Sequence, residues 1–157
     1  MKLTTVLCAC LAVCLLTPFL VHAQSTKDQV KAAQNAIEAD KKRVVTENME
    51  FTEAEAKAFW PLYEKYQDDQ KKIGKRMTEL IENYGKVHKV MNDDAAEKLL
   101  NKQFAIQMDR VKLMQEYLPK FKEILPMTKV ARYYQIENKY RAALDYEISK
   151  GIPLVEQ

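Results

Sequence analysis

The residues that could carry chemistry are few in this chain of 157 residues. Its three cysteines, Cys8, Cys10 and Cys14, all lie in an apolar stretch near the start, and beyond residue 23 His88 is the one histidine. Thiol chemistry and a zinc site of cysteine and histidine are therefore excluded from the rest of the chain, and a catalytic triad would depend on that single ring. We expect a protein that is not an enzyme, with no catalytic residue and no cofactor.

A metal site is the alternative that His88 leaves open. Met91 and Asp93 follow it closely, and imidazole, thioether and carboxylate groups can all bind metal ions. We interpret His88 as a solvated loop residue, and the aspartates beside it as residues that stabilise a helix N-terminus. A metal-responsive sensor or scavenger that uses His88, Met91 and Asp93 is the competing hypothesis.

A basic cluster is formed by Lys71, Lys72, Lys75 and Arg76. On a helix, residues 71 and 75 share one face and residues 72 and 76 share another. Aspartates at 68 and 69 favour a solvated face with salt links. The functional alternative is a positive rim that attracts acidic, partly unfolded polypeptides by long-range steering.

Methionines offer a second kind of contact with such client polypeptides. Met49, Met91 and Met127 lie near predicted helix ends, where a flexible apolar side chain is readily exposed, and we predict that they contact clients. Met77 and Met114 fall on apolar stripes and are assigned to the core.

Composition limits the remaining function classes. Hydrophobic residues make up 47% of the chain, which excludes disorder over most of its length. The net charge of +3 is too small to act as a nucleic-acid-binding field, so we expect no nucleic-acid partner.

Residues 1–23 have the pattern of a cleaved export signal. Lys2 supplies a positive start, residues 3–20 form an uncharged apolar run, and Val21-His22-Ala23 places small or compact residues at the cleavage site. We predict cleavage after Ala23 and a periplasmic location. The alternatives are a permanent membrane anchor and, because Leu11-Ala12-Val13-Cys14 resembles a lipoprotein cleavage box, lipidation of Cys14.

The rest of the chain reads as four helices without strands. Residues 24–50 predict an N-terminal arm with a weak helix from Lys27 to Val45, and residues 51–157 predict a single domain. Thr52 to Glu55 has the form of a capping box, so the next helix should start there, bend at Pro61 and stop at a left-handed Gly85.

The third helix should begin at an Asp94 cap and end at Pro126, and the fourth should run from Thr128 to Lys150. We predict that a heptad seam of the third helix faces the second helix. Its members are Leu100, Phe104, Gln107, Val111, Met114, Leu118, Phe121 and Leu125.

The predicted architecture is all-α: four helices built around a long antiparallel helical hairpin. Central helices of about 33 residues would be roughly 50 Å long at 1.5 Å per residue, so the molecule should be elongated. A thin hairpin leaves apolar surface uncovered, and we predict a homodimer that buries roughly 1,200–2,000 Å².

Two short segments carry a family resemblance. Phe51-Thr52-Glu53-Ala54-Glu55 and Leu125-Pro126-Met127-Thr128-Lys129 resemble degenerate copies of the L-T-x-x-Q signature of Spy/CpxP-like periplasmic proteins. The order of signal peptide, weak first helix, long hairpin and final helix is similar as well. The copies depart from the signature at Phe51 and Glu55, and at Pro126 and Lys129.

The resemblance implies a bent protomer that pairs into a cradle-shaped dimer. It also implies an ATP-independent chaperone or envelope-stress role, with unfolded or partly folded polypeptides as partners. Regulation of a membrane sensor kinase is a further possibility that the resemblance raises.

Overall fold

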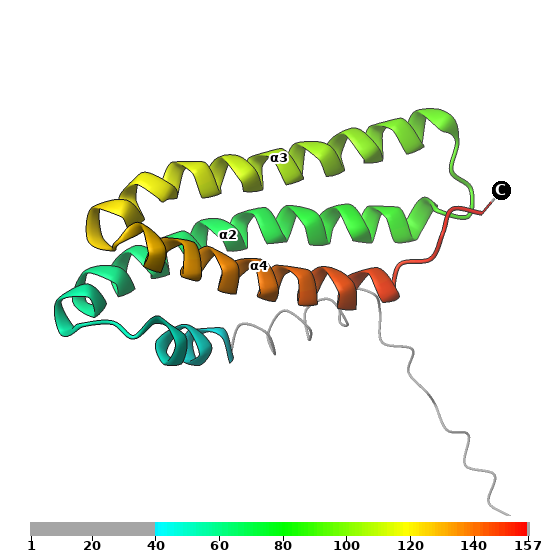
Figure 1. Ribbon diagram of the computed structural model, residues 1–157. Helices are drawn as coiled ribbons and strands as arrows, with labels where there is room; N and C mark the ends of the chain where they lie inside the picture. Colours follow the sequence, from blue (N-terminus) through cyan, green and yellow to red (C-terminus); the bar gives the residue numbers. More distant parts are fainter. Residues whose placement is uncertain (1–39, 157) are drawn as a thin grey trace, which may run out of the picture.

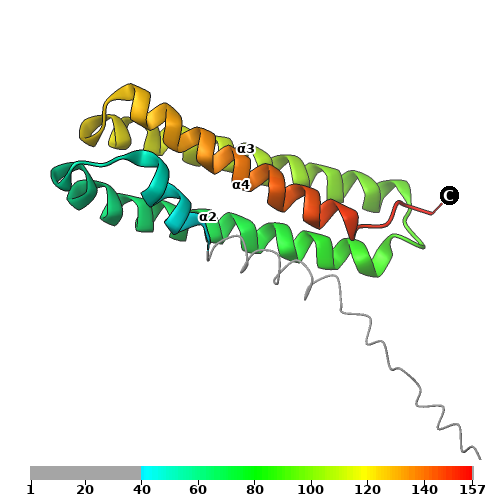
Figure 2. The ribbon, with the colours of Figure 1, turned by 60° about the horizontal axis from the view of Figure 1, so that its bottom comes forward.

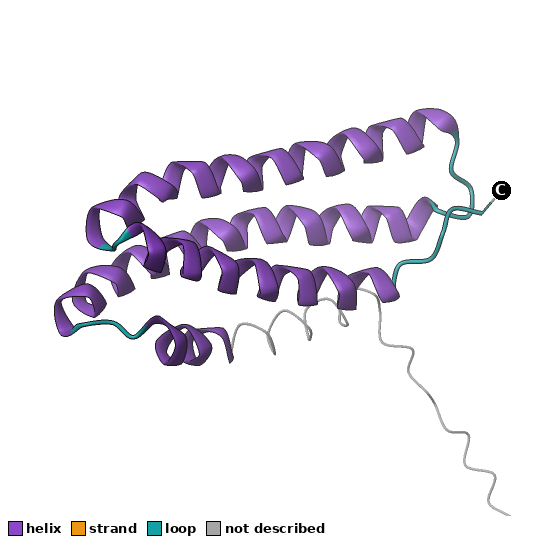
Figure 3. Cartoon of the chain, viewed as in Figure 1, coloured by secondary structure: helices purple, strands orange, loops and turns teal. Residues whose placement is uncertain are grey.

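The computed structural model describes residues 40–156, and every regular element within that range is an α-helix (Figure 3). Residues 40–49 form a first helical segment, followed by α2 (Glu53–Val87), α3 (Asp93–Ile124) and α4 (Met127–Lys150). The predicted all-α class is confirmed. The export signal, Cys14 and the start of the first predicted helix lie outside the described residues.

The three long helices run lengthwise beside one another, so the described part of the chain is elongated (Figures 1 and 2). Side-chain contacts between α2 and α3 join Asp69 to Tyr117 and Arg76 to Asp109. Because the numbers rise along α2 as they fall along α3, the two helices are antiparallel. None of the helices within residues 40–156 is long and apolar enough to cross a membrane.

Local sequence signals account for the start of α2. The hydroxyl of Thr52 accepts a hydrogen bond from the Glu55 backbone N–H at 3.2 Å, and the Glu55 carboxylate accepts one from the Thr52 N–H at 2.8 Å. This confirms the predicted capping box. The predicted stop at Gly85 is wrong, because no described glycine has a positive φ and α2 continues to Val87. Glycine permits a left-handed conformation but does not impose one.

The connections on either side of α3 differ from the prediction in one detail. Asn92, not Asp94, is the N-cap of α3, and its side chain accepts a hydrogen bond from Ala95 N–H at 2.9 Å. Asp94 lies in the first turn, where its charge offsets the helix dipole. The break at Pro126 is confirmed, since α3 ends at Ile124 and Pro126 is the N-cap of α4.

The core is aromatic at the end where α2 and α4 begin. The side chains of Phe59, Tyr66, Tyr117, Phe121 and Tyr133 are all almost completely buried. The ring centre of Phe121 lies 6.3 Å from that of Tyr117 and closer to those of the other three. Segment 40–49 covers this cluster with residues from its own apolar face. The part of the predicted N-terminal arm that the structure describes therefore belongs to the core.

Met49 corrects one of the predicted client contacts. Its side chain is 0% exposed, as is that of Val45 one turn earlier. The prediction was wrong because a helix end is exposed only when no other element packs on it, and here Met49 joins the core formed by α2, α3 and α4.

The predicted seam of α3 is also corrected. Phe121 and Leu125 are buried, and Met114 and Leu118 pack partly against the core, but Leu100, Phe104 and Val111 are about half exposed and Gln107 is exposed. The buried face instead contains Ile106, Leu113 and Tyr117. Apolar residues occupy two adjacent surfaces of α3. Their spacing alone does not show which of these surfaces packs against α2.

Candidate functional site

The basic cluster is divided between two sides of α2. Lys71 and Lys75 line a polar cavity of about 460 Å³ between α2 and α4, whereas Arg76 forms a 2.7 Å ion pair with Asp109 of α3. Lys72 pairs with Asp69 at 2.7 Å, and Lys71 lies 4.0 Å from Asp68. Three of the four cations therefore have acidic neighbours.

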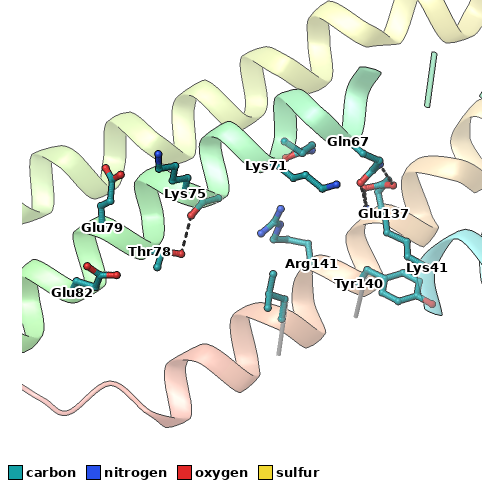
Figure 4. A pocket seen from close by; sticks show the side chains of 13 residues that line it. Lys41, Gln67, Lys71, Lys75, Thr78, Glu79, Glu82, Glu137, Tyr140 and Arg141 are labelled. Carbon is teal, nitrogen blue, oxygen red and sulfur yellow. Dashed lines mark hydrogen bonds and ion pairs between the residues drawn. The ribbon is translucent and has the colours of Figure 1, made fainter. Parts of the chain in front are cut away.

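Charges of both signs face the polar cavity. Figure 4 shows Arg141 extending from α4 toward α2, with Lys71 and Lys75 on the α2 side and Glu79 and Glu82 further along that helix. The cavity therefore has a polar lining with charges of both signs, and no nucleophile lies beside a general base among the residues that line it.

At one end of this cavity a buried ion pair joins segment 40–49 to α4. Lys41 Nζ lies 2.6 Å from Glu137 Oε2, and Gln67 Nε2 donates to Glu137 Oε1 at 3.0 Å (Figure 4). Both charged side chains are nearly inaccessible to solvent. Sequence patterns do not indicate this pair, because its members are 96 residues apart along the chain.

Ion pairs shift the pKa of two carboxyl groups near the cluster. A hydrogen bond from Lys72, assisted by one from the Tyr117 hydroxyl, lowers the pKa of Asp69. A hydrogen bond from Arg76 lowers the pKa of Asp109. These shifts hold the acids ionised, as expected of structural salt links and not of proton donors.

The two signature-like segments contact each other. Lys129 Nζ lies 2.6 Å from Glu55 Oε2 and donates to the Glu50 carbonyl oxygen at 2.8 Å. The hydrogen bond from Lys129 is the main cause of the lowered pKa of Glu55. Phe51 lies beneath the same ammonium group, at 6.0 Å from its ring centre. Two of the four departures from the signature, Glu55 and Lys129, thus form a complementary pair.

An exposed apolar stripe runs along α3. Its members are separated by four, four and three residues, so they share one face of the helix. Their exposed fractions are 50%, 54%, 58% and 54% for Leu100, Phe104, Met108 and Val111, respectively. Asp109, which holds Arg76, lies on a different face by the same helical geometry. The apolar stripe and the basic cluster therefore occupy separate surfaces.

The residues of the hypothetical metal site lie at the connection between α2 and α3. The ring of His88 stacks on Tyr84, and its Nδ1 lies 3.0 Å from the Gly85 carbonyl oxygen. Met91 is half-buried and Asp93 is exposed at the start of α3. Over residues 40–156, no three histidine, cysteine or acidic side chains are grouped so that they could hold a metal ion. Met127, the remaining methionine assigned to clients, is 52% exposed.

The chain matches no protein-family model, no curated protein and no solved structure. Its function must therefore be argued from the surfaces described above.

Proposed function

We propose that this protein is an exported, non-enzymatic polypeptide-binding protein that holds unfolded or partly folded chains without ATP. The exposed stripe Leu100, Phe104, Met108 and Val111 on α3 carries the proposal. An apolar surface that a helix presents in a continuous row is typical of an interaction site, whereas exposed apolar residues scattered singly are ordinary.

The side chains of the stripe suit a variable partner. Phe104 offers a large apolar ring, and Met108 offers an unbranched thioether that adapts to irregular surfaces. Ile106 and Leu113 anchor another face of α3 in the core, so the stripe is held in place before any client arrives. A pre-positioned surface avoids the entropic cost of ordering on binding.

Lys71, Lys72, Lys75 and Arg76 supply the second part of the proposal. They lie on another surface from the stripe and most of them have acidic neighbours, so their role is to steer acidic clients and not to hold them. Steering depends on net positive potential and weakens as salt screens it. The stripe then supplies short-range adhesion.

A homodimer is compatible with the same surface. If the stripes of two copies packed against each other, each would shield the other from water. Clients would then compete with the second copy for the stripe. Protein concentration would thereby regulate client binding, because dilution frees the stripe. Sedimentation over a wide range of protein concentrations measures this directly.

The test of polypeptide binding is aggregation of an unrelated unfolding protein without ATP. We expect the wild type to suppress aggregation and a Phe104→Gln/Met108→Gln variant to lose most of that activity at unchanged helicity. The matched control is Val90→Gln/Tyr146→Gln, which removes two exposed apolar side chains outside α3 and should remain active. No suppression by the wild type at several-fold excess would overturn the proposal.

A metal-responsive role is separated from this proposal by calorimetric titration with zinc, copper and nickel salts. Tight stoichiometric binding that is lost in His88→Ala would favour the sensor or scavenger hypothesis. Binding that is absent or unchanged in that variant would remove the role assigned to His88, Met91 and Asp93.

A further inference from the structure

A second, larger cavity lies at the opposite end of the molecule from the aromatic core. It measures about 650 Å³ and lies between the last turns of α2, the first half of α3 and the end of α4. Apolar side chains from all three helices form most of its wall, among them Leu80, Leu99 and Ile148. Its volume falls in the range of small-molecule sites, which is about 300–1,000 Å³.

One half-buried cation, Arg110, lines this mainly apolar cavity. Arg110 projects from α3, and its Nε is buried and has no hydrogen-bond partner among residues 40–156. Burial is also the main cause of the lowered pKa of its guanidinium. A buried Nε–H without a hydrogen-bond acceptor is costly, because it loses water and gains nothing equivalent. Arg110 is thus a site that an anionic group would stabilise.

The charges around Arg110 are not balanced by the protein. Asp145 is the one carboxylate that lines the cavity, and it already lies 3.9 Å from Arg141. Arg110 and Arg141 therefore share a single acidic neighbour, with one positive charge in excess. Guanidinium groups bind carboxylates through paired hydrogen bonds, which makes a carboxylate a suitable ligand.

The cavity places its charged and apolar parts at different ends. Among its α3 residues, Arg110 is the innermost, and Ala96 lies fourteen residues nearer the α2–α3 connection. At 1.5 Å per residue this separation is about 21 Å, long enough for an extended alkyl chain. Between the two, Gln107 and Gln103 lie nearer Arg110 and Leu100 and Leu99 lie nearer Ala96, so the α3 wall is polar beside the cation and apolar farther from it.

The C-terminal residues close the far end of this cavity. The Tyr84 hydroxyl donates a hydrogen bond to the Pro153 carbonyl oxygen at 2.6 Å, and the Glu156 N–H donates to the His88 carbonyl oxygen at 3.3 Å. Figure 1 shows this segment passing from α4 to the connection between α2 and α3. Leu154 and Val155 thereby join the wall.

We propose that this cavity binds a long-chain carboxylate of the fatty-acid type, with the alkyl chain between the three helices and the carboxylate on Arg110. The single cation at one end of an apolar cavity distinguishes such a ligand from a neutral apolar molecule. The cavity also suits such a ligand better than a polypeptide segment, because the repeated backbone polar groups of a polypeptide would find few partners on the apolar walls. The site is separate from the stripe on α3, apart from Leu100, which belongs to both.

The test is calorimetric titration of the protein with laurate below its micelle concentration. We expect one laurate per chain, a loss of affinity of tenfold or more in Arg110→Gln, and no such loss in Lys112→Gln. Lys112→Gln is a matched control, because this substitution removes the same charge from an exposed position on the same helix. Circular dichroism and thermal melting of each variant establish that it is folded.

A second titration tests the charge of the ligand. Dodecyltrimethylammonium has an alkyl chain of the same length and the opposite charge, and we expect it to bind at least tenfold more weakly than laurate. Equal binding of the two amphiphiles would reduce the site to a non-selective apolar cavity and overturn the proposal. So would the absence of laurate binding, or full laurate affinity in Arg110→Gln.

An Ala96→Trp variant locates the ligand independently of charge. The indole should fill the end of the cavity away from Arg110 and weaken laurate binding, while suppression of aggregation by the stripe should persist. Unchanged laurate affinity in this variant would place the ligand elsewhere. Polypeptide binding and laurate binding can therefore fail separately.

Discussion

The two ends of this molecule are built from the same long helices but are filled differently. At the aromatic end, Phe59, Tyr66, Phe121 and Tyr133 form a continuous cluster that segment 40–49 covers. At the open end, three helices and the C-terminal residues enclose a cavity of about 650 Å³ with mainly aliphatic walls.

The difference shows what segment 40–49, as a fourth helical element, contributes to the packing of α2, α3 and α4. Val45 and Met49 fill the space beside α2 and α4 at the aromatic end, and the large rings bring close packing. At the open end Tyr84 is the one aromatic side chain that lines the cavity, and the described residues include no fourth helix there. Stability should therefore be concentrated at the aromatic end, and ligand binding at the open end.

The largest expected effect comes from the centre of the aromatic end. Phe121→Ala should cost about 3–5 kcal/mol in the free energy of unfolding, because the ring is fully buried and its loss leaves a cavity. Phe104→Ala changes the same residue type on the exposed face of the same helix and should stay within about 0.5 kcal/mol. Denaturant unfolding measures both. Equal losses of unfolding free energy in the two variants would contradict the assignment of Phe121 to the buried face of α3 and of Phe104 to the exposed face.

The second prediction concerns the ion pair that fastens segment 40–49. Lys41→Met should cost about 3 kcal/mol, because it leaves the Glu137 carboxylate buried without its cation. Lys42→Met is the control, since its partner Glu64 is exposed and such pairs are worth about 0–1 kcal/mol. Thermal melting compares the variants. A Lys41→Met protein as stable as wild type would show that this segment contributes little to the aromatic end.

Alkaline pH should weaken the aromatic end selectively. Burial raises the pKa of Tyr134 to about 12 and that of Tyr133 well above its ordinary value of 10. The unfolded chain therefore loses these protons at a lower pH than the folded chain does. Their contribution is fully present below pH 10 and is lost as the pH rises toward the folded-state pKa.

Melting temperatures measured from pH 8 to pH 12 test this sign. Tyr134→Phe should lose part of the decline in melting temperature above pH 10. Below pH 10 it removes the hydrogen bond from the Tyr134 hydroxyl to the Met114 carbonyl oxygen, worth about 0.5–1.5 kcal/mol at all these pH values. A wild-type melting temperature that is flat up to pH 12 would contradict the buried state of these tyrosines.

The smallest stability effect should come from the basic cluster. Replacing Lys71, Lys72, Lys75 and Arg76 with Gln removes exposed ion pairs worth about 0–1 kcal/mol each, so helicity should be retained and melting little changed. Capture of an acidic client should nevertheless slow and lose part of its salt dependence, as stopped-flow mixing at low and high salt would record. Capture as fast as wild type at low salt would make the cluster a solvated face only.

Local signals made much of the fold predictable from sequence. The capping box at Thr52 and the break at Pro126 depend on neighbouring residues, and both are present in the structure. The predicted seam of α3 failed at Leu100, Phe104 and Val111 because the neighbouring face, with Ile106 and Leu113, is equally apolar. Tertiary packing, which single-helix periodicity does not contain, decides between two such faces.

The candidate sites were less predictable than the fold. The basic cluster is visible in the sequence because its four members lie close together along the chain. Their division between the side of α2 that faces α4 and the side that faces α3 depends on how the helices pack. Arg110 carried one usable signal: it lies four residues after Ile106 and three before Leu113, on a face that is otherwise apolar. A cation at such a position indicates a partner or a binding site.

The ion pair between Lys41 and Glu137 has a consequence for the order of folding. Its members are 96 residues apart in sequence, so it closes a much longer loop than any contact across the short α2–α3 connection. Long loops close late because their entropic cost precedes the contacts that compensate it. We therefore expect segment 40–49 to dock after α2 and α3 have paired. Until that step, the aromatic face would be uncovered.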